Sequence, residues 1–263
     1  MTATTAAPDA AIRAYDEMAP IYDAFTAHHR HDVWTDMVVA LLRPHGLADR
    51  GRLLDVGCGT GKSFLPWEAR GWDVVACDSS PAMVRRAAAK AGPRTETLVA
   101  DARDLGALGS FELVTMVDDV LNYLAPGEVD AAFEGAARNL ARGGLFVFDV
   151  NLLRAYRTFF AETHVLGTDE CFMVWRGAAS PEFAPAEVAE ATLDAFVEHE
   201  PGCWSRVHAL HRQHHHPPAE LAERLRAAGF EVCGLHGVDD ECRAGDAVDE
   251  QRHGKAVVVA RRR

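Results

Sequence analysis

Residues 53–63 constrain the fold more than any other stretch of the chain. An apolar run at 53–56 is followed by glycines at alternate positions, Gly57, Gly59 and Gly61, and then by a helical pattern. Glycine tolerates positive φ and carries no Cβ, so a ligand can approach the backbone of such a turn closely. The free N–H groups at the start of the next helix attract negative charge. The stretch therefore predicts a strand, a tight turn and a helix that bind a nucleotide-like or carboxylate-bearing ligand.

The spacing of these glycines narrows the choice of ligand. A dinucleotide fingerprint, G-x-G-x-x-G, fits the observed G-x-G-x-G poorly. A phosphate loop, G-x-x-x-x-G-K-[ST], would end on Gly61, Lys62 and Ser63, but its first glycine would fall on Val56. Neither motif explains the turn, so Lys62 and Ser63 are not expected to bind phosphate.

The string L-D-V-G-C-G-T-G at residues 54–61 resembles motif I of the class I methyltransferases that use S-adenosylmethionine (SAM). The resemblance covers residues 15–150 and 217–261. It implies that the turn and Asp55 face the amino acid end of SAM, with S-adenosylhomocysteine as the product. It also implies a seven-stranded, Rossmann-like sheet whose last strand is antiparallel.

Strand and helix patterns alternate through residues 51–151, the expected SAM-binding core. Strands are predicted at 52–56, 72–78, 97–101, 111–117 and 145–150. This alternation is typical of a doubly wound α/β fold, a parallel sheet covered by helices on both faces. Right-handed crossovers bring the C-terminal ends of the strands to one edge, where the ligand binds.

Four residues near the ends of these strands are candidates for further cofactor contacts. A carboxylate at Asp78 suits a ribose diol, although it could instead cap the next helix. Met83 could cover the adenine ring or belong to the core. The family resemblance implies that Asp101 and the backbone of Ala102 hold the adenine amino group. Val117 is expected beside the cofactor.

The acidic segment after the fourth strand is the expected catalytic segment. Asp118 and Asp119 are adjacent carboxylates at the end of a buried strand, where charges need partners. The resemblance implies that this segment lies beside the methyl donor. We expect Asp118 and Tyr123 to be catalytic, Asn122 to contact the acceptor, and Asp119 to cap the following turn. Asn151, at the end of the fifth strand, is a further acceptor contact.

Residues 12–50 are expected to form a helical flap, preceded by a disordered segment at 1–11. Two tyrosines, Tyr15 and Tyr22, each precede an aspartate. They could simply pack on the core, but the resemblance places such a tyrosine near the reactive methyl group. We therefore expect Tyr22 to be a catalytic and cofactor contact and Tyr15 to contact the acceptor.

Three histidines in the segment 28–31 raise the question of a metal site. Adjacent residues do not share a helix face, and no nearby cysteine or carboxylate completes a ligand set. We therefore predict no metal, and an acceptor-facing loop that contains His28 and His29.

Residues 152–216 form an insertion relative to a minimal version of this fold, before the chain returns to the core at 217–263. A helix is predicted at 152–161, followed by three extended stretches at 163–177, 187–200 and 203–214. We interpret them as an antiparallel lid over the ligand edge, similar in layout to that of sugar-amine and glycopeptide N-methyltransferases, or as a dimer interface. Trp175 and His211 are its candidate acceptor contacts.

Composition excludes some classes of partner. The formal net charge of −12 disfavours nucleic acid. No apolar run is long enough to span a membrane. Six cysteines without a C-x-x-C pair, and no secretory segment, suggest a cytoplasmic protein. We expect a monomer or homodimer acting on a small molecule.

The predicted reaction is methyl transfer from SAM to the amine nitrogen of an amino sugar or natural-product intermediate. One alternative is an O-methyltransferase acting on a small-molecule hydroxyl. An alternative of another class is a sensor protein that binds SAM or S-adenosylhomocysteine without turnover.

Overall fold

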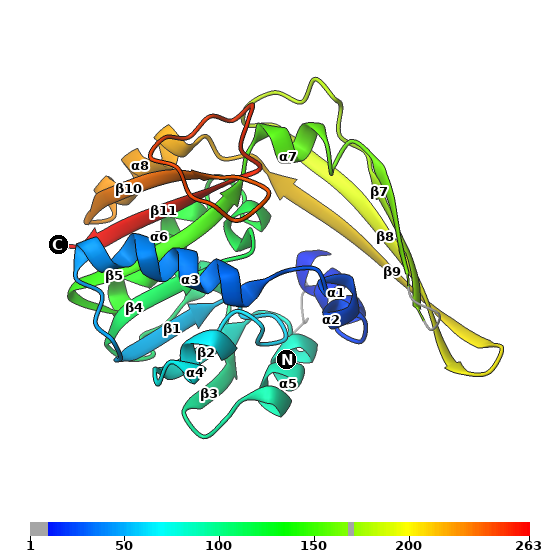
Figure 1. Cartoon of the computed structure of the whole chain (residues 1–263), viewed down its shortest axis with the longest axis horizontal. Helices are drawn as coiled ribbons and strands as arrows, with labels where there is room; N and C mark the ends of the chain where they lie inside the picture. The colour runs from blue at the N-terminus through cyan, green and yellow to red at the C-terminus, as the bar shows by residue number, and fades with distance from the viewer. Residues whose placement is uncertain (1–9, 168–170) are drawn as a thin grey trace, which may run out of the picture.

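A mixed sheet flanked by helices forms the core of the computed structural model, which describes residues 10–167 and 171–263 (Figure 1). The strand order is β10-β11-β5-β4-β1-β2-β3, and β11 runs antiparallel to both neighbours. The strands are β1 (Arg52–Val56), β2 (Asp73–Asp78), β3 (Thr95–Val99), β4 (Phe111–Met116), β5 (Leu140–Asn151), β10 (Phe230–Val238) and β11 (Lys255–Arg262). The predicted seven-stranded sheet with an antiparallel last strand is confirmed.

Successive residues of the central strands pack against two different helical layers. Leu53 and Leu113 belong to a buried cluster with α3 (His31–Leu42), α4 (Leu65–Ala69) and α5 (Pro81–Lys90). Leu54 and Val114 belong to another, with α6 (Val129–Asn139) and α8 (Pro218–Ala227). Because side chains alternate between the faces of a strand, an almost continuous apolar run is what a sheet covered on both sides requires.

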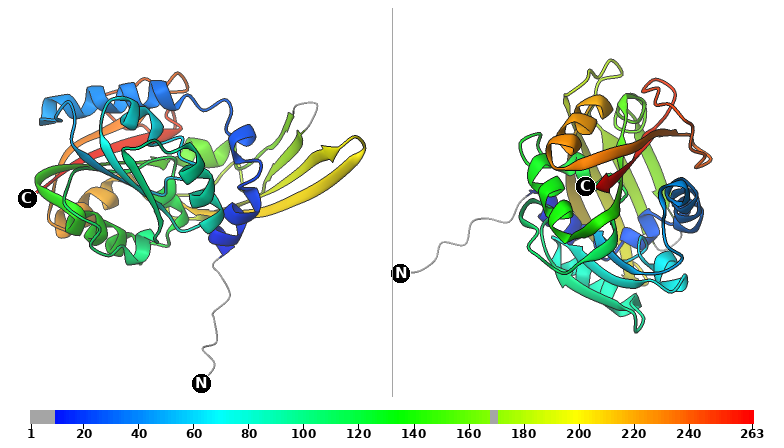
Figure 2. Two further views of the ribbon diagram at one scale, coloured as in Figure 1. Left: turned by 90° about the horizontal axis from the view of Figure 1, so that it is seen from below. Right: turned by 90° about the vertical axis from the view of Figure 1, so that its left-hand side faces the viewer.

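Two short N-terminal helices lie between the core sheet and a second sheet (Figure 2). They are α1 (Ala10–Met18) and α2 (Tyr22–Phe25). Helix α1 already includes residues 10 and 11, which we expected to be disordered; residues 1–9 lie outside the described part of the chain. Helix α3 packs on the core sheet, so within the predicted flap at 12–50 only the first two helices approach the second sheet.

The insertion forms an antiparallel sheet of four strands among the described residues, in the order β6-β7-β8-β9. These are β6 (Thr163–Gly167), β7 (Cys171–Gly177), β8 (Val188–Glu200) and β9 (Cys203–His214). The stretch predicted as one strand at 163–177 folds back on itself, because Thr163 pairs with Arg176. The helix predicted at 152–161 is also shorter: α7 (Leu153–Arg157) ends where Thr158 leaves helical geometry.

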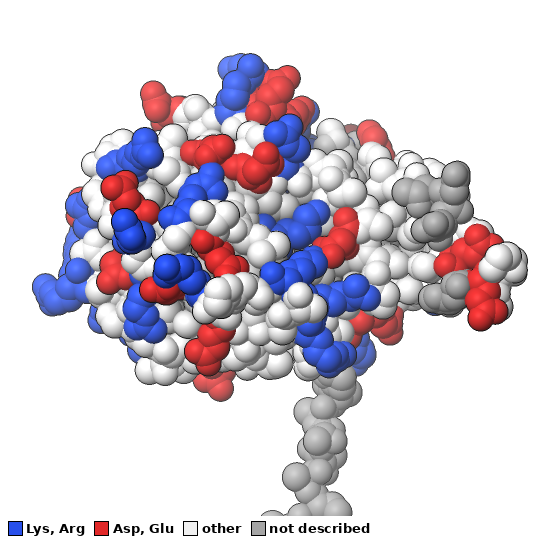
Figure 3. Space-filling model, turned by 60° about the horizontal axis from the view of Figure 1, so that its bottom comes forward, with Lys and Arg blue, Asp and Glu red and all other residues white. Residues whose placement is uncertain are grey.

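One face of this second sheet packs against α1 and α7 through a cluster that includes Met18, Tyr156, Met173 and Ala191. Three short 3-10 helices, η1 (Arg43–His45), η2 (Ala102–Asp104) and η3 (Val120–Tyr123), complete the described secondary structure. None of the helices in the described residues has the length and apolar character that a membrane crossing needs. Acidic and basic side chains are intermingled over the face shown in Figure 3.

Candidate active site

The glycine turn lies between β1 and α4, at the C-terminal edge of the parallel strands. Gly57 and Gly59 have φ of 76° and 53°. A Cβ on Gly57 would lie 2.4 Å from Cγ2 of Val120, so a side chain has no room there. The Gly57 N–H donates to the Cys77 carbonyl at 2.8 Å, which ties the turn to β2. The turn therefore exposes backbone rather than side chains to a ligand.

Asp78 holds this edge together at the end of β2. Its Oδ2 accepts from the Gly59 N–H and its Oδ1 from the Ser80 N–H, both at 2.8 Å. Burial raises the pKa of Asp78, although both backbone donors lower it. A carboxylate has about four acceptor positions, so Asp78 can still receive a ligand hydroxyl.

A narrow cavity of about 90 Å³ lies against the turn and joins most of the predicted cofactor contacts. Its lining includes Gly57, Gly59, Asp78, Asp101 and Ala102. Asp101 also caps η2, since its Oδ1 accepts from the Arg103 N–H at 2.9 Å. We refer to this space as the cofactor cavity.

Four other predicted cofactor residues do not line the cofactor cavity. Asp55 is buried beneath the turn and accepts from Ser63 Oγ at 2.5 Å; burial raises its pKa to about 6. Met83 is fully buried in the cluster formed with α1, which favours the core role. Gly61 and Val117 are also buried and are not among the lining residues.

A larger cavity of about 550 Å³ lies between the ligand edge of the core sheet, the α1–α2 segment and the second sheet. It brings together predicted acceptor contacts from distant parts of the sequence. His28, His29, Asn151, Trp175 and His211 all line it. We refer to this space as the acceptor cavity.

Four residues line both cavities: Tyr15, Tyr22, Asp118 and Tyr123. The ring of Tyr15 lies 6.0 Å from that of Tyr22 and 5.3 Å from that of Tyr123, measured between centroids. All three residues predicted to be catalytic belong to this group. It marks the junction at which a group could pass from one cavity to the other.

Tyr123 is oriented by a histidine of the second sheet. Its hydroxyl lies 2.9 Å from Nδ1 of His211, and the indole of Trp175 packs against the same imidazole with ring centroids 5.2 Å apart. Burial lowers the pKa of His211 to about 4, so the imidazole is neutral at pH 7. A base this weak is poorly suited to removing protons, and the contact instead positions the tyrosine hydroxyl.

A partly buried lysine that sequence reasoning missed lies next to the junction of the two cavities. Lys255 Nζ is 2.6 Å from Asp149 Oδ2, 2.8 Å from Asp119 Oδ1 and 3.9 Å from Asp118 Oδ1. Burial alone would lower the pKa of Lys255, but these carboxylates raise it well above its usual value. The lysine therefore stays protonated and acts as a fixed positive charge.

The prediction that Asp119 caps the next turn is wrong. Asp119 begins η3 with a φ of 55° and no side-chain cap. Its carboxylate instead accepts from Lys255 and, at 2.5 Å, from Nε2 of Gln213 on β9. The Asp119 carboxylate bonds to the Lys255 ammonium rather than to the backbone N–H groups of the turn, because an ionic hydrogen bond is stronger than a neutral one.

A clue to Lys255 was present in the sequence. It is a charged residue directly before the apolar run at 256–260 of the last strand. Because that strand is antiparallel, it starts at the edge where the parallel strands end, and its first side chain reaches the ligand edge.

Asp118 faces two histidines, His29 in the loop after α2 and His31 in the first turn of α3. Its Oδ2 lies 3.7 Å from Nδ1 of His29 and 3.5 Å from Nε2 of His31. The expectation that no carboxylate completes this histidine set is therefore wrong, because β4 and the loop, far apart in sequence, meet here. His29 and Lys255 hold the pKa of Asp118 well below its usual value, although burial raises it.

The backbone at this point is strained. Asp118 and Asp119 have φ of 64° and 55°, in the left-handed region that non-glycine residues rarely adopt. Such conformations cost roughly 1–3 kcal/mol each and concentrate at functional sites. The two left-handed residues direct adjacent carboxylates to different partners.

Asn122 does not line the acceptor cavity, contrary to its predicted role as an acceptor contact. It is fully buried; its Nδ2 donates to the His214 carbonyl and its Oδ1 accepts from the Asn151 N–H, both at 2.9 Å. Through these two hydrogen bonds the Asn122 side-chain amide joins β9 to β5. It thereby holds the second sheet against the core.

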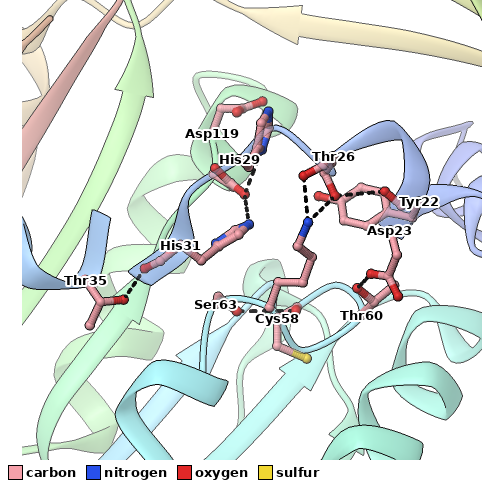
Figure 4. Close-up of polar contacts among 12 residues, drawn as sticks. Tyr22, Asp23, Thr26, His29, His31, Thr35, Cys58, Thr60, Ser63 and Asp119 are labelled. Atoms are coloured by element: carbon pink, nitrogen blue, oxygen red, sulfur yellow. Dashed lines mark hydrogen bonds and ion pairs between the residues drawn. The ribbon is translucent and has the colours of Figure 1, made fainter. Parts of the chain in front are cut away.

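Helices α1 and α2 are fastened over the cofactor cavity by polar contacts. Asp16 Oδ1 accepts from Ser80 Oγ, and Asp23 Oδ1 accepts from Thr60 Oγ1, both at 2.6 Å. Lys62 donates to the Thr26 carbonyl at 2.6 Å, which explains the lysine that mimics a phosphate loop. Figure 4 shows Tyr22, Asp23 and Thr26 lying above the turn that carries Thr60.

Comparison with known proteins identifies the family. A family model described as a methyltransferase domain matches residues 53–144. A protein of Geobacillus sp. (strain WCH70), named only as a methyltransferase, is 31% identical over 223 residues, covering 83% of this chain and 89% of that protein. The cypemycin N-terminal methyltransferase of Streptomyces sp is 30% identical over 232 residues, covering 82% and 89%. The chain belongs to the class I SAM-dependent methyltransferases.

A solved structure shows the same fold across the whole methyltransferase. The sugar N-methyltransferase from Streptoalloteichus sp ATCC 53650 superimposes with a TM-score of 0.73 at 22% identity, covering 100% of this chain and 98% of that one. The methyltransferase takes its methyl group from SAM.

Proposed function

We propose that the methyltransferase transfers the methyl group of SAM to the amine nitrogen of a small molecule, such as an amino sugar or a natural-product intermediate. The observation that carries this proposal is the junction of the two cavities. Tyr15, Tyr22, Asp118 and Tyr123 line both spaces. A methyl donor in the narrow cavity and an acceptor in the larger one would meet at these four side chains.

The residues of the cofactor cavity fit SAM. The turn at Gly57 and Gly59 offers backbone at a place where a Cβ on Gly57 would collide with Val120, which suits the amino acid end of the donor. Asp78 offers acceptor positions to the ribose diol. Asp101 and Ala102 line the same cavity, which supports the proposed contacts of the Asp101 carboxylate and the Ala102 backbone with the adenine amino group.

The size of the cofactor cavity supports a movement of helices α1 and α2 when SAM binds. The cavity measures about 90 Å³, whereas cavities for ligands of this size span roughly 300–1,000 Å³. We infer that the contacts of Asp16 and Asp23 with the core open and close in each cycle. Closure over the bound donor would exclude water from the junction.

The chemistry of the junction favours an amine acceptor. SAM supplies a methyl group on a sulfonium, which a lone pair displaces directly. Asp118 gives the junction negative charge and the tyrosine rings give it π faces, and both attract an ammonium group before it loses its proton. A neutral amine then attacks without further help, whereas a hydroxyl more often needs a general base.

Two titratable groups of the acceptor cavity fit this choice. Lys255 stays protonated, and the pKa of His211 is lowered to about 4, so neither is suited to act as a general base for a hydroxyl. The main contribution of the protein is alignment of the lone pair with the methyl carbon, which can supply several orders of magnitude in rate. One similar structure is named as a sugar N-methyltransferase and one relative as an N-terminal methyltransferase, which supports the same choice.

The proposal can be tested by incubating the enzyme with SAM and a panel of amino sugars, small amines and matched hydroxyl compounds. We expect S-adenosylhomocysteine to form only with amines, and mass spectrometry with NMR to place the methyl on nitrogen. Methylation of oxygen would identify an O-methyltransferase. Calorimetric binding of SAM without turnover across the panel would identify a sensor. Either result would overturn the proposal.

Two variants test the junction itself. Tyr123→Phe removes the hydroxyl that pairs with His211, and we expect it to lower kcat while leaving the Kd of SAM nearly unchanged. His208→Gln is a matched control, since His208 lies on the second sheet and outside the described lining of both cavities. Equal rates for the wild type and Tyr123→Phe would place the acceptor elsewhere.

A further inference from the structure

We propose that His29, His31 and Asp118 form a binding site for a divalent transition-metal ion, of the zinc or cobalt type, at the rim of the acceptor cavity. Three potential ligand atoms converge there from three places in the chain: the loop after α2, the first turn of α3 and the end of β4. They are His29 Nδ1, His31 Nε2 and a carboxylate oxygen of Asp118, all within 4.8 Å of one another.

The distances suit a common metal ion. Zinc binds imidazole nitrogen and carboxylate oxygen at about 2.0–2.2 Å, so two such ligands at a tetrahedral angle lie roughly 3.4 Å apart. The Asp118 oxygen lies 3.5 Å from the His31 nitrogen and 3.7 Å from the His29 nitrogen. The two imidazole nitrogens lie within 4.8 Å of each other, so the rings would have to approach by up to about 1.4 Å to complete a tetrahedral set. In Figure 4 both imidazoles are directed toward one carboxylate.

A second observation points to a missing partner for His31. Its Nε2 is buried and makes no hydrogen bond to any described residue, and only 12% of its side chain is exposed. Buried polar atoms are nearly always satisfied, and a metal ion is a partner that would satisfy an imidazole nitrogen lying next to a carboxylate.

Lys255 does not occupy the proposed position. It approaches Oδ1 of Asp118, at 3.9 Å, whereas both histidines face Oδ2. Its charge is also shared with Asp119 and Asp149, which lie nearer to it. Three carboxylates thus surround one ammonium, and this excess of negative charge favours a further cation.

The site would leave coordination positions open toward the acceptor. His29, His31 and Asp118 all line the acceptor cavity, and Asp118 also lines the cofactor cavity. Three protein ligands leave at least one position for another molecule, as in catalytic zinc sites. A metal bound here would hold an oxygen or nitrogen atom of the acceptor close to the cavity junction.

Metal binding can be measured without SAM or an acceptor, so the result does not depend on the proposed reaction. Chelator-treated enzyme is titrated with cobalt(II) chloride, followed by its visible absorption, and with zinc chloride, followed by calorimetry. We expect one equivalent to bind. His31→Gln and Asp118→Asn should each weaken binding at least about tenfold. His28→Gln, which alters an exposed histidine of the same loop, should leave it unchanged.

Controls separate a lost site from a lost fold. Circular dichroism and the metal-free Tm show whether each variant is folded, and the stabilisation of the wild type by zinc gives a second readout that the variants should lose. No binding by the folded wild type would overturn the proposal. So would binding that persists in both His31→Gln and Asp118→Asn, or a sulfur-to-cobalt charge-transfer band showing that a cysteine is the ligand.

Discussion

Replacing Lys255 by methionine tests whether the buried charge cluster holds the ligand edge together. The lysine ammonium contacts Asp149 at 2.6 Å and Asp119 at 2.8 Å, and Asp149 is fully buried. Methionine keeps most of the side-chain volume but removes the charge. The three neighbouring carboxylates then lose their shared counter-ion inside the protein, where an unpaired charge is poorly solvated.

The cost can be worked out from the contacts. Removing one partner of a buried ion pair typically costs about 3–5 kcal/mol. Because 25% of the Lys255 side chain is exposed, we expect the lower end, a loss of about 3 kcal/mol in the free energy of unfolding. This is a large share of the roughly 5–15 kcal/mol that stabilises a typical protein. Urea unfolding of both proteins, with equal m-values, measures the loss directly.

Two further variants decide whether the mechanism is correct. Lys90→Met breaks the partly exposed ion pair with Asp23 and should cost less than about 1 kcal/mol. The double variant Lys255→Met/Asp149→Asn removes a buried carboxylate as well as the lysine, and should recover part of the lost stability. A loss in Lys255→Met no greater than in Lys90→Met, or no recovery in the double variant, would refute the reasoning.

Three other predictions concern the cofactor cavity, the flap and acid stability. Asp78→Ala should raise the Kd of SAM at least several-fold in calorimetry, and an unchanged Kd would remove the ribose assignment. Asp23→Ala breaks the contact with Thr60 and should speed release of S-adenosylhomocysteine in stopped-flow measurements; an unchanged rate would exclude a closing flap. Burial lowers the pKa of His211 and His216 to about 4. Between pH 6.5 and 4 the unfolded chain therefore binds more protons than the folded protein. The free energy of unfolding should fall by up to about 3 kcal/mol per histidine as the pH is lowered from 6.5 to 4. His216→Gln should flatten the profile, and equal slopes would contradict this assignment.

The cofactor side of the site was largely predictable from sequence. The glycine turn follows a predicted strand, and Asp78 and Asp101 are each the last residue of one; in a parallel sheet all such positions reach one edge. Local periodicity and connection rules are therefore enough to bring them together. The same rule, applied to an antiparallel last strand, would have found Lys255 at its first position.

The sequence predicted that the insertion at 152–216 forms an antiparallel sheet, but not the bounds of all its strands and helices. Alternating residues correctly indicated extended stretches at 187–200 and 203–214, but not that the stretch 163–177 is two paired strands. The length of the helix predicted at 152–161 was also overestimated, since α7 ends at Arg157. Whether a segment continues or folds back depends on its neighbours in the sheet as well as on its own pattern.

The sequence by itself determined the sheet, the glycine turn and the strand ends that line the cofactor cavity, because these follow from periodicity and parallel connectivity. Only the tertiary structure decided the directions of the side chains around the acceptor. Two left-handed residues aim Asp118 toward His29 and His31 and Asp119 toward Lys255, while Asn122 turns inward. These directions arise where β4, β9, β11 and the loop before α3 pack together, and no pattern along a single segment encodes them.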